Sequence, residues 1–279
     1  MTGFVVREMG ASHLDMAVKW AENEGWNPGL GDAPDFRAAD PGGFLMGFLD
    51  DQPATAIAAV RYGVDFGFIG LYIVVPELRG KGHGWATWQA GMERLNGRVI
   101  GLDGVLAQQD NYRKSGFELA HRNVRYGGRP QTSRVADERL VRVDSQLLPS
   151  VIAFDRAFFP GPREDFLRAW LNPERRTSLA YVQEGHVCGY GTIRACRTGH
   201  KIGPLFAERE DVADLLFQAL AAEAPEEVFL DLPEPNHAAI ALADRHALQP
   251  VFETARMYRG PAPQLPLERI YGITTFELG

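Results

Sequence analysis

Residues 79–84, Arg-Gly-Lys-Gly-His-Gly, form a loop in which every second residue is glycine. An apolar run typical of a β-strand, residues 68–74, precedes this loop, and a helix-like segment follows it. Alternating glycines allow the backbone to turn several N–H groups toward one point, and the helix adds its unpaired N-terminal donors and the positive end of its dipole. Together with the charges of the arginine and the lysine, these features predict binding of a phosphate or a pyrophosphate.

The spacing of the glycines excludes two common phosphate-binding loops. A P-loop ends in Gly-Lys followed by Ser or Thr, whereas this loop ends in Gly84-Trp85. The dinucleotide-binding fingerprint needs a third glycine after a gap of two residues, and Thr87 stands at that position.

The positions Arg79-x-x-Gly82-x-Gly84 resemble the acetyl-CoA loop of the GNAT N-acetyltransferases, which reads Gln/Arg-x-x-Gly-x-Gly/Ala between a strand and a helix. Residues 71–77, which lead into the loop, also match the usual approach in that family. Residues 111–117, Asn-Tyr-Arg-Lys-Ser-Gly-Phe, resemble the late GNAT signature, a tyrosine four residues before a Gly-Phe pair. Loop, approach and late signature occur in the expected order, so the first half of the chain is similar to a GNAT domain.

The resemblance implies that the protein uses acetyl-CoA as its acyl donor. The backbone of the glycine loop would hold the pyrophosphate, and the free edge of a splayed fourth strand would hold the pantetheine arm. The cofactor-binding residues expected on this basis are Ile73, Val74, Val75, Arg79, Gly80, Lys81, Gly82, His83, Gly84 and Asn111. The three strand residues also fit an ordinary buried strand, and His83 also fits a variable loop position without a role.

Two residues are candidates for catalysis. Tyr112 matches the tyrosine that protonates the departing thiolate in many GNAT enzymes, and a phenol with a pKa near 10 is a suitable donor. The alternative is that its ring only packs beside Phe117. Asp103 is a carboxylate inside an apolar strand, where burial would raise its pKa toward the range of a general base for the acceptor ammonium. It fits equally well as a structural carboxylate bound by nearby backbone N–H groups.

Trp26 and Asn27 are the residues expected to bind the acceptor substrate. They lie between the first two predicted helices, where GNAT folds shape the acceptor pocket, although the tryptophan could equally pack the end of a helix. No metal is expected, because the seven histidines show no His-x-x-x-His spacing and the two cysteines form no Cys-x-x-Cys pair.

Composition restricts the location and the partners. A net charge of −7 without a basic stripe makes a nucleic-acid partner unexpected. No apolar stretch approaches the ~20 residues of a membrane span, and the first residues lack the apolar core of a signal peptide. The expected protein is cytoplasmic, does not bind a membrane, and is a monomer or a homodimer.

The order of predicted elements occurs twice along the 279 residues. We expect a catalytic GNAT domain over 1–128 and a degenerate GNAT-like domain over 136–279, joined by a polar linker at 127–135. Each domain would be of the α/β (α+β) class, with a mixed, mostly antiparallel twisted sheet flanked by helices. In the second copy, the loop 207–211 has no glycine and carries three carboxylates, which would repel a phosphate. The whole pattern resembles bacterial two-domain GNAT acetyltransferases.

The function expected from the resemblance is transfer of an acetyl group from acetyl-CoA to a primary amine of a small molecule. Two alternatives stay open at this point. One is a non-catalytic sensor that binds acyl-CoA. The other is a protein acetyltransferase, acting on lysine or an N-terminus, whose acidic second half would dock a basic partner surface.

Overall fold

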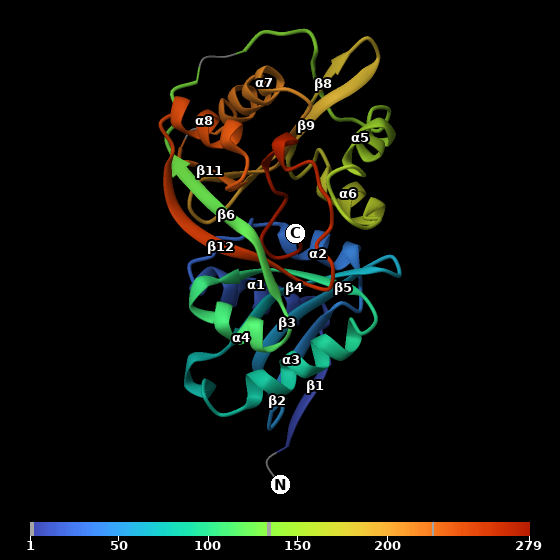
Figure 1. Cartoon of the computed structure of the whole chain (residues 1–279), viewed down its shortest axis with the longest axis vertical. Helices are drawn as coiled ribbons and strands as arrows, with labels where there is room; N and C mark the ends of the chain where they lie inside the picture. The colour runs from blue at the N-terminus through green and yellow to red at the C-terminus, as the bar shows by residue number, and fades with distance from the viewer. Residues whose placement is uncertain (1–2, 133–134, 225) are drawn as a thin grey trace.

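A computed structural model describes residues 3–132, 135–224 and 226–279. Within these residues thirteen strands form one hydrogen-bonded sheet, and helices pack on its faces (Figure 1). The predicted α/β class with a mixed sheet is confirmed. No helix of the described residues combines the length and the apolar character needed to cross a membrane.

The first half of the chain runs in the order strand, helices, strands, glycine loop, helix and further strands. Its elements are β1 (Phe4–Glu8), α1 (Ala11–Asn23), α2 (Asp32–Ala39), β2 (Phe44–Leu49), β3 (Gln52–Tyr62), β4 (Phe66–Val74), η1 (Pro76–Leu78), α3 (His83–Arg94), β5 (Val99–Val105), η2 (Leu106–Gln108), α4 (Gln109–Lys114) and β6 (Glu118–Gly128).

The second half repeats this order. Its elements are β7 (Leu140–Arg142), α5 (Leu148–Asp155), α6 (Glu164–Trp170), β8 (Thr177–Gln183), β9 (His186–Ala195), β10 (His200–Ala207), α7 (Glu210–Ala221), β11 (Val228–Pro233), α8 (His237–Arg245), β12 (Gln249–Arg259), η3 (Leu267–Arg269) and β13 (Ile270–Gly272). The linker expected over 127–135 starts later than predicted, because residues 127 and 128 still belong to β6. Its residues 133 and 134 lie outside the described residues.

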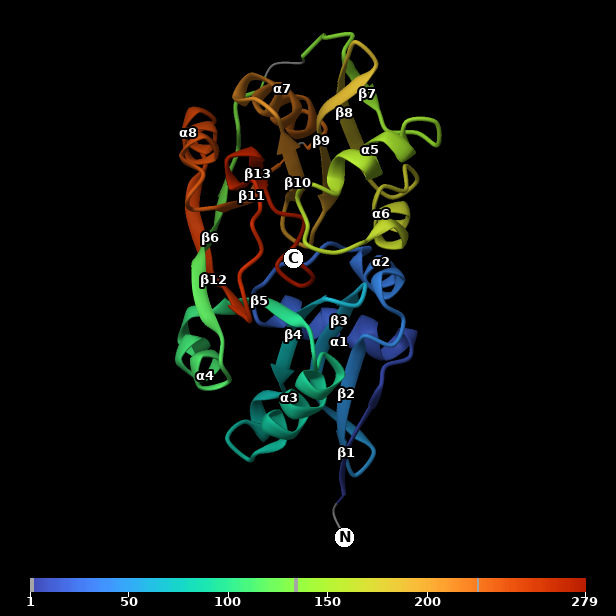
Figure 2. The ribbon, with the colours of Figure 1, turned by 45° about the vertical axis from the view of Figure 1, so that its right-hand side comes forward.

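The two halves exchange their last strands, which the sequence did not predict. The strand order is β1-β2-β3-β4-β5-β12-β6-β11-β10-β9-β8-β7, so β12 of the second half lies between β5 and β6. In turn β6 of the first half pairs with β11. Figure 2 shows β6 and β12 side by side along the junction of the halves. Neither half therefore contains all the strands of its own part of the sheet. The predicted domain boundaries at residues 128 and 136 rest on the order of the elements along the chain and stay a prediction.

Aromatic side chains also connect the halves. Phe36 of α2 stacks on Trp170 of α6 with 6.3 Å between ring centroids, and Tyr62 of β3 meets Phe159 edge-on at 4.6 Å. All four belong to one buried cluster that includes strands and helices of both halves. Large aromatic rings contribute much of the apolar area that folding removes from water, so this cluster holds the halves in one orientation.

A buried ion pair crosses the exchanged strands. Arg125 of β6 donates to the two carboxylate oxygens of Asp231 of β11, at 2.6 and 2.8 Å, and both side chains are almost completely buried. Burial disfavours the charged carboxylate, but the guanidinium of Arg125 outweighs it and holds the pKa of Asp231 below its ordinary value. The pair therefore depends on both partners being present.

We expect Asp231→Asn to lower the free energy of unfolding by about 3–5 kcal/mol, because it leaves a guanidinium buried without its counter-charge. The matched control is Asp211→Asn, which removes an exposed partner of Arg209 and should cost at most about 1 kcal/mol. Denaturant titration of both variants measures the difference. Equal losses would show that the buried pair does not hold the exchanged strands together.

The same pair predicts a pH dependence. Because the folded pKa of Asp231 lies below its unfolded value of about 4, the pair stabilises the fold above that pH. This stability is lost as the pH falls through the folded pKa. Asp231→Asn should therefore lose less stability than the wild type between about pH 7 and about pH 3.

Candidate active site

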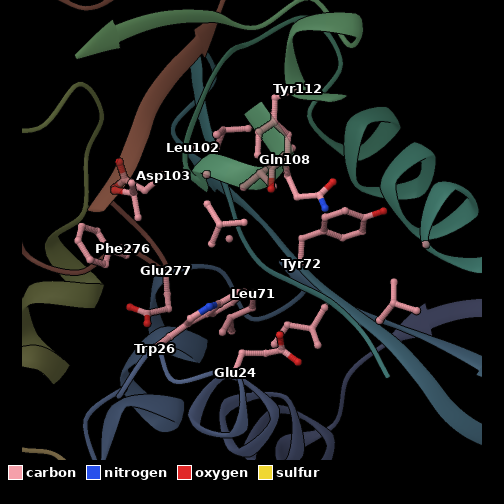
Figure 3. Close-up of a pocket in the computed structure, with 18 of the residues that line it drawn as sticks. Glu24, Trp26, Leu71, Tyr72, Leu102, Asp103, Gln108, Tyr112, Phe276 and Glu277 are labelled. Atoms are coloured by element: carbon pink, nitrogen blue, oxygen red, sulfur yellow. The ribbon is translucent and has the colours of Figure 1, made fainter. Parts of the chain in front are cut away.

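The strands β4 and β5 are paired over only part of their length. Phe66–Ile69 pairs in parallel with Val99–Leu102, and the pairing stops there. Just after this pairing ends, β4 advances three residues from Gly70 to Ile73 while the facing strand β3 advances only two. Leu71, inside this stretch, has a φ of 46°. This bulge bends β4 away from β5. A cleft of about 510 Å³ opens between the two strands (Figure 3).

The glycine loop lies at one end of this cleft. Gly80 and Gly82 have φ values of 75° and 85°, and a Cβ on either would meet no atom within 4 Å. Gly82 is the N-cap of α3, so the unpaired N–H groups of the first helical turn lie at this end. Gly84 has a different role, because a Cβ there would lie 2.8 Å from Val74 Cγ2 and 2.9 Å from Tyr72 Oη. It lets α3 pack closely on β4.

Most residues expected to bind the cofactor line the cleft. They are Ile73, Val74, Arg79, Gly80, Gly82 and Gly84. The guanidinium of Arg79 is fixed by two acceptors, since its Nε donates to the carbonyl of Val74 at 3.0 Å and its Nη2 pairs with Glu24. The loop therefore combines open N–H groups with one oriented positive charge.

The other expected cofactor residues lie outside the cleft lining. The N–H of Val75 donates to the carbonyl of Ala54 in β3, so this amide is already used within the sheet. Lys81 is exposed, and the ring of His83 lies 4.8 Å from that of Phe4. The exposed Asn111 side chain donates to Gln108 Oε1 at 2.7 Å, and it is Gln108 that lines the cleft.

Tyr112 reaches the cleft from α4. Its ring lies against Gly104, where a Cβ would overlap it, and 5.6 Å from the ring of Trp88. The ring is thus packed by Trp88, which also contacts the expected neighbour Phe117. Burial raises the pKa of Tyr112 well above its ordinary value, so the hydroxyl keeps its proton at neutral pH. Packing and proton donation are compatible at this position.

Asp103 of β5 lines the cleft but its carboxylate has partners that the sequence did not indicate. Arg256 of the exchanged strand β12 donates to both oxygens, at 2.8 and 2.6 Å, and Asn123 of β6 donates to one of them at 2.8 Å. These donors are side chains rather than backbone N–H groups. Because the lone pairs already accept three hydrogen bonds, the arrangement favours a structural role for Asp103 in joining β5 to β12.

The two residues expected to bind the acceptor are separated by the structure. Trp26 lines the cleft, and its carbonyl accepts from Arg125 at 2.8 Å. Asn27 lies outside the lining and docks on the second half. Its side chain bonds the backbone of Thr198 at 2.9 and 3.2 Å, and its carbonyl accepts from Lys201 Nζ at 2.9 Å.

Several residues of the cleft were missed by sequence reasoning. From the first half these include Glu24, Leu71, Tyr72 and Gln108, and from the second half Phe252, Thr254, Phe276 and Glu277. Figure 3 shows Tyr72, Gln108 and Tyr112 on one side of the cleft and Trp26, Phe276 and Glu277 on the other. Burial raises the pKa of Tyr72 to about 12. No local signal marks the second-half residues, because only the strand exchange and the path of residues 273–279 bring them here.

The corresponding place in the second half is filled by the chain itself. Strands β10 and β11 pair only over His200–Ile202 and Val228–Leu230. Beyond that point β13 lies beside β10, and a Cβ on Gly272 would be 2.6 Å from Leu230 Cδ1. The chain then leaves β13 and enters the junction between the halves (Figure 2).

The chain is similar in sequence to several known proteins. Residues 151–272 match the acetyltransferase (GNAT) domain family. A holothin acyltransferase of Pseudoalteromonas sp. (strain SANK 73390) is 32% identical over 263 residues, which cover 94% of this chain and 90% of that protein. The uncharacterized N-acetyltransferase YitH of Bacillus subtilis is 29% identical over 172 residues, or 60% of this chain and 61% of that protein.

Solved structures show the same fold. A candidate acetyltransferase from Pyrococcus horikoshii superimposes with a TM-score of 0.85 at 24% identity, covering 100% of this chain and 97% of that one. A tandem GNAT protein from the clavulanic acid biosynthesis pathway gives a TM-score of 0.61 at 13% identity, with coverages of 94% and 100%.

The chain therefore belongs to the GNAT family of acyltransferases, as the glycine loop and the late tyrosine signature predicted. Its fold is that of the tandem GNAT proteins. Enzymes of this family take their acyl group from an acyl-CoA donor, so the protein is an acyltransferase with a donor of that class.

The open space beside Gly82 predicts the effect of a charge placed there. On the prediction that this loop holds the diphosphate of CoA, Gly82→Asp should weaken CoA binding by about 100-fold or more, because its carboxylate would then face the diphosphate and like charges in contact cost several kcal/mol. Gly185→Asp is a matched control, since Gly185 also has a positive φ and open space but lies in the hairpin between β8 and β9. Calorimetric titration with CoA compares the variants, and thermal unfolding checks their fold. Equal affinities would contradict the assignment of the loop.

Proposed function

We propose that this protein is an acetyl-CoA-dependent N-acetyltransferase that acylates a primary amine of a small molecule. The observation that carries the proposal is the cleft between β4 and β5, which joins the glycine loop at one end to Tyr112 on its wall. A phosphate cradle and a protonated phenol are what thioester chemistry on CoA requires of the protein.

The donor would be held by backbone groups along β4. In a strand the N–H and C=O groups of one residue point to the same side, and those of the next residue point to the opposite side. The amide of Val75 points to β3, so that of Val74 points to the cleft. Arg79 donates a hydrogen bond to the carbonyl of Val74. The N–H of Val74 would therefore be the group that binds the pantetheine arm. The N–H groups of residues 80–84 would receive the pyrophosphate, and Arg79 would add its charge.

In the proposed reaction a neutral amine attacks the thioester carbonyl carbon. The C–N bond forms and the C–S bond breaks. Tyr112 gives its proton to the departing sulfur and regains one from the acylated nitrogen, so the products are an amide and the free thiol. The raised pKa of Tyr112 keeps the hydroxyl protonated for this role.

A small-molecule acceptor is supported by the shape and composition of the cleft. Trp26, Phe252 and Phe276 bring aromatic rings to it, and pockets of this size and composition typically hold small ligands. The relative at 32% identity is named for its action on holothin, which supports a small-molecule acceptor for this chain. We also propose that residues 136–279 form a GNAT-like module that does not bind CoA, because β13 fills its cleft, and that residues 1–128 carry the donor site.

Replacing Tyr112 tests the function directly. Tyr112→Phe should lower kcat by about 10²–10⁴-fold and leave CoA affinity nearly unchanged, because only the proton donor is lost. Tyr126→Phe, in β6 and outside the cleft lining, should keep wild-type activity. Thiol release from acetyl-CoA, followed with a panel of small primary amines, measures both. Undiminished turnover of Tyr112→Phe would assign the ring to packing alone. A wild type that binds CoA without turnover would favour the acyl-CoA sensor.

A further inference from the structure

Trp85 is a large aromatic residue that lies in solvent at the edge of the cleft. It is 57% exposed, whereas Trp88, three residues further along α3, is 4% exposed. Trp88 packs the helix on its neighbours, since its ring lies 5.3 Å from that of Tyr72, 5.6 Å from that of Tyr112 and 5.9 Å from that of Phe117. Trp85 is therefore not the tryptophan that holds α3 on the sheet.

The position of Trp85 distinguishes it from other exposed apolar side chains. Single exposed apolar residues are common on protein surfaces and need no ligand to explain them. Leu30, Val64 and Val251 are examples, because they are exposed and lie outside the lining of the cleft. Among the large exposed apolar side chains of the described residues, Trp85 alone lines the cleft.

The indole of Trp85 is directed toward the glycine loop. Trp85 is the third residue of α3, and helical side chains point back over the turn that precedes them. For Trp85 this preceding turn contains the N-cap, Gly82, and the end of the loop. The residue before it, Gly84, faces β4, because a Cβ there would lie 2.8 Å from Val74 Cγ2. Successive helical residues differ in direction by about 100°, so Trp85 points away from β4.

The space beside the loop is open. A Cβ on Gly80 or Gly82 would meet no atom within 4 Å, and both residues line the cleft. The N–H groups at the start of α3 favour an anion, and the exposed indole offers a flat aromatic face next to them. Such a pair of surfaces is complementary to a ligand that carries a phosphate and an aromatic ring close together.

The donor of the proposed function is a ligand of that kind. Its pyrophosphate joins the pantetheine arm to an adenosine, whose base is planar and aromatic. With the pyrophosphate on the loop and the pantetheine arm along β4, the adenosine must leave the loop on a side that β4 does not occupy. Trp85 lies on such a side. Aromatic side chains are the usual platforms on which proteins stack nucleic-acid bases.

We infer that Trp85 is the residue on which the adenine base of the CoA donor stacks. The inference rests on the proposed function and extends its donor site beyond the pyrophosphate. The base is remote from the thioester, so this contact would be the same before and during acyl transfer. It would therefore raise the affinity for the donor without changing the rate of the chemical step.

The first test compares Trp85→Ala with Gln89→Ala. Gln89 lies one turn further along α3, is exposed and is outside the lining of the cleft. Trp85→Ala should weaken CoA binding about tenfold in calorimetric titrations, because one stacked base is lost. The KM for acetyl-CoA should rise by a similar factor while kcat is unchanged. Gln89→Ala should match the wild type, and Trp85→Phe, which keeps an aromatic face, should retain most of the affinity.

Two further measurements separate the base from the rest of the donor. 4′-Phosphopantetheine lacks the adenosine, so at millimolar concentrations it should compete for the site equally well in the wild type and in Trp85→Ala. Tryptophan fluorescence reports the stacking directly, since CoA should quench the emission of the wild type more than that of Trp85→Phe. This second measurement does not depend on how strongly 4′-phosphopantetheine binds.

Wild-type CoA affinity in Trp85→Ala would overturn the inference and leave the proposed function standing. An equal loss of affinity for CoA and for 4′-phosphopantetheine would do the same, because it would place the contact on the pantetheine arm. Equal quenching by CoA in the wild type and in Trp85→Phe would also overturn it. A wild type that does not bind CoA would overturn the proposed function and, with it, the inference.

Discussion

The end of pairing between β4 and β5 is the constraint on which the rest of the site depends. The bulge at Gly70–Ile73 bends β4 away after Ile69, and the space that opens is lined by backbone on one side and by Tyr112 on the other. A continuous sheet would use these backbone groups internally and leave nothing for a ligand. The separation also explains why the glycine loop can serve the cleft, since the loop follows the free end of the strand that has left its neighbour.

The same opening exists in the second half, and the protein uses it differently. There β13 lies beside β10 where a ligand would otherwise fit, so the second cleft is closed by its own chain. The residues that follow β13 cross the junction and bring Phe276 and Glu277 to the first cleft. One stretch of chain, residues 270–279, therefore fills one GNAT-like opening and completes the other. A duplicated fold in this arrangement acts as a structural partner that also contributes side chains to the site.

The strand exchange makes the two halves depend on each other. Because β12 lies between β5 and β6, Arg256 of β12 reaches Asp103 on the wall of the cleft. Because β6 in turn pairs with β11, Arg125 of β6 reaches Asp231 of β11. Charges buried at this depth are stable only when each has its partner in place. The geometry of the proposed donor site is thus tied to the fold of the second half, although the glycine loop and Tyr112 belong to the first.

Sequence alone determined the features that depend on local backbone preferences. The glycine loop, the strand before it, the helix after it and the tyrosine at 112 occupy the positions expected, because positive φ values and helix N-termini are encoded within a few residues. The partners of Asp103, the docking of Asn27 and the arrival of Glu277 in the cleft could not be predicted in the same way. They result from strands and a terminal segment that pair across more than a hundred residues of sequence, and such pairing is chosen by packing and burial in the folded state rather than by local composition.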